Sequence, residues 1–108
     1  MEKEMMIEFV NGLLAIMERS LVRIVLYGSV ARGTQTEESD IDIALLTHGA
    51  LDDELEDKLS EFIVDMNLKY DRVFSVIDIE YEQFQKWENV LPFYQNVNRE
   101  GVVLWKAA

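Results

Sequence analysis

The sequence predicts an α/β protein of the α+β type, with helices packed on a small sheet. Apolar stretches with the length and β-branched content of strands alternate with longer segments whose apolar residues recur at helical spacing. The 108 residues can enclose one hydrophobic core and are too few for a second. We therefore expect one domain that spans residues 1–108.

The first half of the chain is predicted to hold one long helix and two strands. Residues 4–18 place apolar side chains at helical spacing, with acidic and polar side chains opposite them, which is typical of a helix that packs on a sheet. Residues 21–27 are apolar on both faces except for Arg23, as in a strand from the middle of a covered sheet. A second strand begins at Asp40 and continues to Leu46. A short helical segment and a polar loop are expected between these two strands.

The second half is predicted to alternate in the same way. The expected elements are an acidic helix over residues 51–66, a third strand over 72–81, a short helix over 82–87, a turn or helix start at Pro92 and a last strand over 102–105. The late aromatic residues are expected to form core and cover for the sheet, whereas an exposed cluster among them would indicate a partner surface. These residues are Phe84, Trp87, Phe93, Tyr94 and Trp105.

The charge balance limits the choice of partners. The chain has 10 basic and 21 acidic residues, which give a net charge of −11. Such a surface repels phosphate backbones, so we expect no direct binding of nucleic acid, whereas a basic protein would be attracted. The sequence has no cysteine, no stretch long enough to span a membrane, and no basic N-terminus followed by a secretory core. We expect a soluble cytoplasmic protein.

A Gly-Ser turn follows the first predicted strand. Gly28 lets the backbone turn sharply, and its lack of a Cβ lets a phosphate approach closely. Ser29 stands where the next helical segment would start, so its hydroxyl and the free N–H groups of Val30 and Ala31 can point at phosphate oxygens. The turn is therefore a candidate phosphate cradle.

Two aspartates open the second predicted strand. Asp40 and Asp42 stand two residues apart and alternate with apolar residues, so both carboxylates should project from one face. Taken alone, such a pair is equally typical of the solvated side of an edge strand. Two adjacent acids are also tolerable when a divalent cation neutralises them, and carboxylate oxygens suit Mg²⁺ that bridges to phosphate. The combination predicts metal-assisted phosphoryl or nucleotidyl transfer.

The pattern resembles the signature of the DNA polymerase β-like nucleotidyltransferase superfamily. Gly28 and Ser29 are followed by ten residues and then by Asp40 and Asp42. The segment GSVARG is similar to the corresponding segment of the minimal nucleotidyltransferase branch. The order of the surrounding elements and the closing NREGVVLW also fit, so the resemblance covers most of the chain. It implies a polymerase β-like fold, which is a small mixed sheet with helices packed on one face. It also implies Mg²⁺-dependent transfer of a nucleoside monophosphate, such as AMP from ATP, to a hydroxyl group.

The resemblance assigns roles to individual residues. Asp40 and Asp42 would be the catalytic pair and would bind two Mg²⁺ ions with the nucleotide. Gly28 and Ser29 would cradle the terminal phosphates. Arg32 stands one turn past this cradle, where its guanidinium could hold a phosphate; a structural ion pair with a nearby acid is an equal alternative.

A third metal-binding carboxylate is less well defined. Many relatives carry it on the third strand, where Asp78 is the most inward acid available, and we take Asp78 as the third metal ligand. The alignment of the following EYEQF with similar family members instead places Ser75 at that position. Ser75 and Asp78 belong to opposite faces of the strand. If Asp78 faces away from Asp40 and Asp42, the site has two carboxylates.

The acceptor and the partner are also implied by the resemblance. Larger relatives carry additional domain material that binds the acceptor, and this chain has no room for it. We therefore expect a second protein to supply the rest of the acceptor site. Minimal nucleotidyltransferases of this type resemble the antitoxin of a two-gene module whose toxin is a helical HEPN-domain protein, and such enzymes can adenylylate a tyrosine of that toxin. An alternative is a catalytically weak or inactive antitoxin that neutralises its partner by binding, through the acidic helix or a sheet edge. Homo-oligomer formation stays open.

Overall fold

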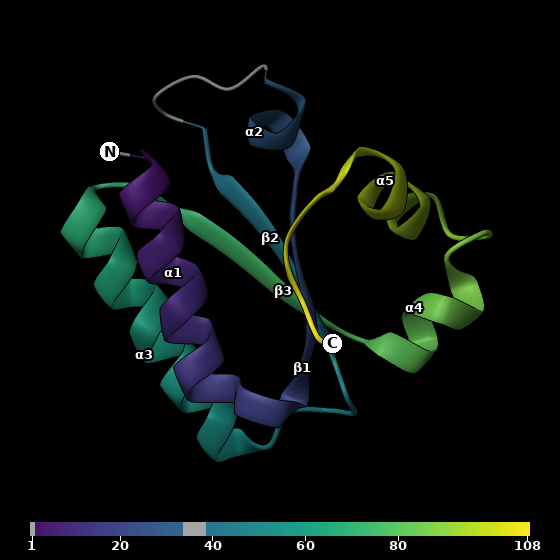
Figure 1. Cartoon of the computed structure of the whole chain (residues 1–108), viewed down its shortest axis with the longest axis horizontal. Coiled ribbons are helices and arrows are strands. Elements are labelled where there is room, and N and C mark those ends of the chain that lie inside the picture. The colour runs from purple at the N-terminus through teal and green to yellow at the C-terminus, as the bar shows by residue number, and fades with distance from the viewer. Residues whose placement is uncertain (1, 34–38) are drawn as a thin grey trace.

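The computed structural model of the chain describes residues 2–33 and 39–108 (Figure 1). The elements in chain order are α1 (Glu2–Met17), the 3-10 turn η1 (Glu18–Ser20), β1 (Leu21–Tyr27), α2 (Gly28–Arg32), β2 (Ile41–Thr47), α3 (Asp53–Tyr70), β3 (Phe74–Glu80), α4 (Tyr81–Trp87), α5 (Pro92–Glu100) and β4 (Val102–Lys106). The four strands lie where the sequence predicts them, and the segment that begins at Pro92, expected as a turn or a helix start, is the helix α5.

The strands form a mixed sheet in the order β3-β2-β1-β4. The central strand β1 pairs antiparallel with both β2 and β4, whereas β2 and β3 run parallel. Parallel neighbours need a crossover connection, which α3 provides. This topology places the end of β1 beside the beginning of β2, where the two halves of the sequence motif lie.

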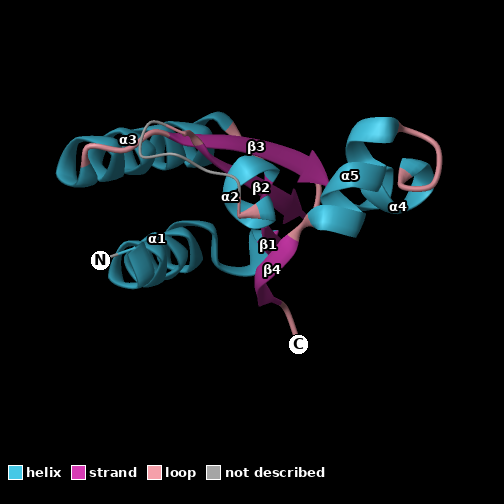
Figure 2. Cartoon of the chain, turned by 90° about the horizontal axis from the view of Figure 1, so that it is seen from above, coloured by secondary structure: helices cyan, strands magenta, loops and turns pink. Residues whose placement is uncertain are grey.

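Helices cover both faces of the sheet. Ile41, Ile43 and Leu45 of β2 join the core formed with α1 and α3, while Ala44 and Leu46 join a second core formed with α4 and α5. Figures 1 and 2 show α1 and α3 on one side of the sheet and α4 and α5 on the other. The predicted fold class is confirmed, but the helices occupy two faces rather than one, because β2 is apolar on both sides.

Local capping sets the boundaries of α3. Asp52 precedes the helix and its carboxylate accepts a 2.8 Å hydrogen bond from the N–H of Leu55, so it is the N-cap of α3. The helix continues past its predicted end to Tyr70, and Asp71 ends it with a left-handed φ of 52°. The other boundaries lie within two residues of the predicted ones. Pro92 is the first residue of α5.

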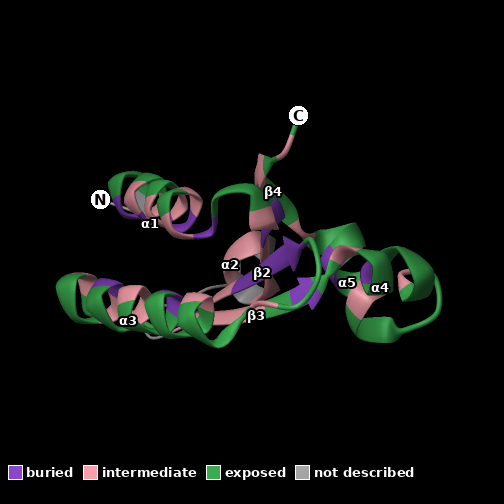
Figure 3. Cartoon of the chain, turned by 90° about the horizontal axis from the view of Figure 1, so that it is seen from below, coloured by how far each residue is buried: buried purple, intermediate pink, exposed green. Residues whose placement is uncertain are grey.

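The two long helices are in close contact along their length. The ring of Phe62 fills the space beside Gly12, where an added Cβ would lie 2.1 Å from a ring atom. Nearer the other end of the contact, the Glu8 carboxylate accepts hydrogen bonds from Lys69 Nζ at 2.8 and 3.0 Å and from the Tyr70 hydroxyl at 2.6 Å. Figure 3 shows the buried positions of α1 and α3 on their inner sides. Apolar packing and hydrogen bonds at the surface therefore hold α1 and α3 together.

Candidate active site

The turn after β1 lies against the side chain of Asp42. Gly28 is the first residue of α2 and has a left-handed φ of +73°. An added Cβ at Gly28 would lie 2.3 Å from Oδ2 of Asp42, so the carboxylate occupies the space that a side chain would need. Tyr27, the last residue of β1, pairs directly with Asp42 across the sheet. The structure thus brings Gly28 and Asp42 into contact. Glycine is required there because the backbone is left-handed and because a Cβ would collide with the Asp42 carboxylate.

The acid pair lies at the start of β2. Asp40 immediately precedes the strand, which begins at Ile41, and its side chain is exposed. Asp42 is half-buried, and alternation places it on the same face as Ala44, the face of α4 and α5. Both carboxylates therefore lie at the end of the sheet next to α2. Their hard oxygen donors suit Mg²⁺.

The short helix α2 carries the other predicted phosphate ligands. It begins at Gly28, directly after β1, and contacts both β1 and β2. Ser29 and Arg32 belong to this helix, but their side chains lie outside the described part of the structure. The backbone of α2 is thus placed against the strand that bears Asp42.

The third strand does not contribute the predicted acid. In the parallel pair of β2 and β3, Asp42 is opposite Ser75, whereas Asp78 is opposite Leu45. Partners in register share a face, so Ser75 shares the face of Asp42, and Asp78 lies on the opposite face, exposed. This corrects the prediction of Asp78 as a third metal ligand. Among residues 2–33 and 39–108, no group of three or more His, Cys, Asp or Glu residues could hold a metal ion.

Two aromatic residues beside the acid pair were not singled out from the sequence as site residues. Tyr27 shares the face of Asp42, and partial burial, together with the negative charge of Asp42, raises the pKa of its hydroxyl. The ring of Phe93, in the first turn of α5, packs edge-to-face against Tyr27 with centroids 5.6 Å apart. The position of Tyr27 directly before Gly28 was a usable signal. Phe93 gave none, because its contact with Tyr27 arises from tertiary packing.

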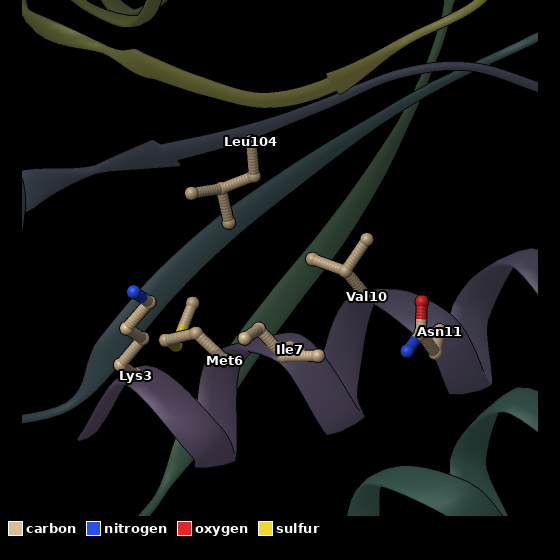
Figure 4. Close-up of a pocket in the computed structure, with 6 residues that line it drawn as sticks. All are labelled: Lys3, Met6, Ile7, Val10, Asn11 and Leu104. Atoms are coloured by element: carbon tan, nitrogen blue, oxygen red, sulfur yellow. The ribbon is translucent and has the colours of Figure 1, made fainter. Parts of the chain in front are cut away.

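A separate pocket of about 250 Å³ lies between α1 and β4. Figure 4 shows the side chains that line it, which are Lys3, Met6, Ile7, Val10, Asn11 and Leu104. This lining is mainly apolar and includes none of the predicted site residues. The pocket is therefore not the candidate active site. Separately, no helix in the described part of the chain combines the length and the apolar content needed to cross a bilayer.

Two known proteins resemble the chain in sequence over two thirds or more of its length. The chain is 38% identical over 104 residues to MJ0604 of Methanocaldococcus jannaschii, named as a candidate protein adenylyltransferase, and the match covers 96% of this chain and 98% of that protein. A second M. jannaschii protein of the same description, MJ0141, is 34% identical over 74 residues, which cover 68% of this chain and 75% of the relative.

Several solved structures with this fold are toxin–antitoxin complexes. A complex with AMP-PNP contains a chain with a TM-score of 0.69 and 26% identity, matched over 94% of this chain and 73% of that one. The fold also matches a chain in the complex of tri-AMPylated Shewanella oneidensis HEPN toxin with MNT antitoxin, with a TM-score of 0.64, 21% identity and coverage of 99% and 74%. The family model of the nucleotidyltransferase domain matches residues 10–97. The chain therefore belongs to the nucleotidyltransferase domain family and is a minimal nucleotidyltransferase.

Proposed function

We propose that this protein transfers AMP from ATP to a hydroxyl group of a partner protein. In this reaction the acceptor oxygen forms a bond to the α-phosphorus, the bond from that phosphorus to pyrophosphate breaks, and the hydroxyl proton is released to solvent. The observation that carries the proposal is the contact between Gly28 and the Asp42 carboxylate. A glycine turn and an acid that converge at one point form a site for an anion accompanied by a cation.

In this proposal the residues of the turn bind the phosphates and the acid pair binds the metal. Gly28 and Ser29 cradle the terminal phosphates at the start of α2, and Arg32 assists with its guanidinium. Asp40 and Asp42 hold Mg²⁺ with their carboxylate oxygens, which fits the donor chemistry at the start of β2. When bound, Mg²⁺ neutralises phosphate charge and acidifies the acceptor hydroxyl. The protein orients the two reactants and positions fixed charges around them.

The acceptor is proposed to be a tyrosine of a helical HEPN-type toxin, which the protein would silence as an antitoxin. Support comes from the adenylyltransferase name of the M. jannaschii relative and from the toxin–antitoxin complexes that share the fold. The net charge of −11 favours a partner with a basic surface. A binding-only antitoxin is the second candidate, and the position of Ser75 opposite Asp42 favours it, because a site with two carboxylates binds metal less tightly than one with three.

The substitution Asp42→Asn tests the catalytic proposal. It removes the charge while keeping the shape, and we expect AMP transfer to fall by about 10²–10³-fold or more. The readout is mass spectrometry of a HEPN-type protein from the same organism, co-expressed with this chain, together with the thermal midpoint of the variant.

Asp78→Asn is the matched control, because it makes the same chemical change on the opposite face of the sheet. We expect this variant to transfer AMP at the wild-type rate. Retained transfer by Asp42→Asn would refute the assignment of the site. An unmodified partner with the wild-type chain, in a complex that still forms, would favour the binding-only antitoxin.

A further inference from the structure

Phe93 presents an apolar ring that is fixed on one side and open on the other. It lies in the first turn of α5, and 42% of the residue is exposed. Its ring packs edge-to-face against Tyr27 at an interplanar angle of 85° and lies 6.1 Å from the ring of Tyr94. Tyr94 in turn packs against Phe84, which is buried in the core beneath α4 and α5. Phe93 is therefore connected to the core, although much of its own surface faces solvent.

The position of this ring relates it to the candidate active site. Tyr27, which supports Phe93, is the direct cross-strand partner of Asp42 and shares its face. The helix α5 that carries Phe93 contacts both β1 and α2, and Figure 1 shows α5 beside α2 at the same end of the sheet. Through its contact with Tyr27, Phe93 is therefore linked to the strand position directly opposite Asp42.

A nucleotide needs more than a phosphate site. Gly28 and the acid pair can account for the phosphates and the cation, but they offer nothing to the base. Aromatic side chains bind bases by stacking, and every base has a flat face that can take part. Tyr27 packs edge-to-face with the Phe93 ring and so holds its orientation, while 42% of the Phe93 residue stays exposed. Phe93 has no polar atom, so a stacked base would gain affinity there without selection for one base.

We propose that the base of the nucleoside triphosphate stacks on the exposed ring of Phe93, and that Tyr27 is the positioning residue that holds this ring. The proposal rests on the proposed function, because it takes the phosphate end of the nucleotide to lie at Gly28 and Asp42. It adds the second end of the binding site, on an element distant in sequence from the signature. It also assigns the first turn of α5 to substrate binding.

The test compares two ligands that share phosphates and differ in the base. Binding of AMP-PNP and of inorganic tripolyphosphate, each with Mg²⁺, is measured by calorimetry on the full chain. For Phe93→Ala we expect AMP-PNP affinity to fall by about 5- to 150-fold, the range for loss of one base–aromatic stack, with tripolyphosphate affinity unchanged. Phe93→Trp should restore AMP-PNP binding. Leu91→Ala is the matched control, because Leu91 has 41% exposure and precedes the same helix, and its AMP-PNP affinity should equal that of the wild type.

The outcomes separate this inference from the function on which it rests. If the wild type binds neither ligand, the proposed function fails, and the base platform fails with it. If the wild type binds both ligands and Phe93→Ala binds AMP-PNP equally well, only the platform is overturned. Equal losses in Phe93→Ala and Leu91→Ala would also overturn it, because they would indicate general damage to α5. Loss of transfer to the protein acceptor with unchanged AMP-PNP affinity would assign Phe93 to the acceptor instead.

Discussion

The two faces of the sheet differ in how completely they are covered. Over β2, the face of α1 and α3 is closed by a core that includes Phe9, Leu13 and Ile43, all fully buried, and the pocket of this face lies farther along, at β4. The face of α4 and α5 is closed over Ala44 and Leu46, but near α2 it leaves Asp42, Ser75 and Tyr27 only partly buried. A single strand, β2, supplies residues to both faces in alternation.

Within β2, the positions that face α1 and α3 contribute to stability, whereas Asp42, on the opposite face, belongs to the candidate active site. Neighbouring positions such as Asp42 and Ile43 point to opposite faces, so each can change with little effect on the role of the other. The predominantly apolar character of β2 makes the strand a rigid support for the carboxylate at its beginning. The proposed catalytic pair therefore stands on the best-buried strand of the sheet, which limits the movement of Asp42 relative to Gly28.

Truncation of Ile43 should produce the largest loss of stability. Ile43→Ala removes buried methyl groups from the closed face, and we expect the free energy of unfolding to fall by about 2–5 kcal/mol. Chemical denaturation measures this change. At a temperature where the variant remains folded, ATP binding should match that of the wild type. A variant that keeps full stability but loses ATP binding would contradict the separation of the two faces.

A side chain at Gly28 should damage both properties to an intermediate degree. Gly28→Ala forces a residue with a Cβ into a left-handed backbone, which costs about 1–2 kcal/mol. The Cβ also meets Oδ2 of Asp42, so the carboxylate must move, and a displacement of about 1 Å lowers an enzymatic rate by about 10²-fold. Denaturation and the transfer assay are the two measurements.

Gly49→Ala separates these two effects. Gly49 has a similar φ of +75°, but no described atom lies within 4 Å of its added Cβ. We expect a similar loss of stability with no loss of transfer. If both variants lost activity equally, backbone strain rather than the contact with Asp42 would explain the result at Gly28.

The parts of the site that lie close to the signature could be predicted from the sequence. The run of apolar residues before Gly28 and the alternation after Asp40 predict two strands, and the signature formed by the Gly-Ser turn and the acid pair predicts that their adjoining ends meet at one phosphate site. The number of strands and the alternation of helices followed from the same local patterns. Local periodicity therefore accounts for most of the fold, and the signature accounts for the proximity of Gly28 and Asp42.

Features that depend on register and on distant packing could not be predicted in this way. Asp78 is a plausible ligand from its strand alone, but its position relative to Asp42 depends on how β3 aligns with β2, and Ser75 is the residue in register. The sequence from Pro92 likewise predicts a turn or a helix start without predicting which face of the sheet this segment covers. For this reason Phe93 was expected to be sheet cover, whereas the structure places its exposed ring beside Tyr27.

The pH dependence of stability should reveal the hydrogen bonds that Lys69 and Tyr70 donate to Glu8 on the closed face. This is the smallest of the predicted effects. Hydrogen bonds from Lys69 and then from Tyr70 lower the pKa of Glu8 below its usual 4.5, so this stabilisation is full above pH 4.5 and is lost as the pH falls through the lower folded pKa. The same carboxylate raises the pKa values of Lys69 and Tyr70, so their contribution is lost as the pH rises through those raised values.

Glu8→Gln should therefore weaken the dependence of the thermal midpoint on pH at both extremes, while ATP binding stays unchanged. The shift is expected to be small, because the groups lie at the surface, where solvent screens them. Glu61→Gln, an exposed position on α3, controls for the loss of one negative charge and should leave the shape of the profile intact. A change in ATP binding in Glu8→Gln would connect the closed face to the site and would contradict the independence of the two faces.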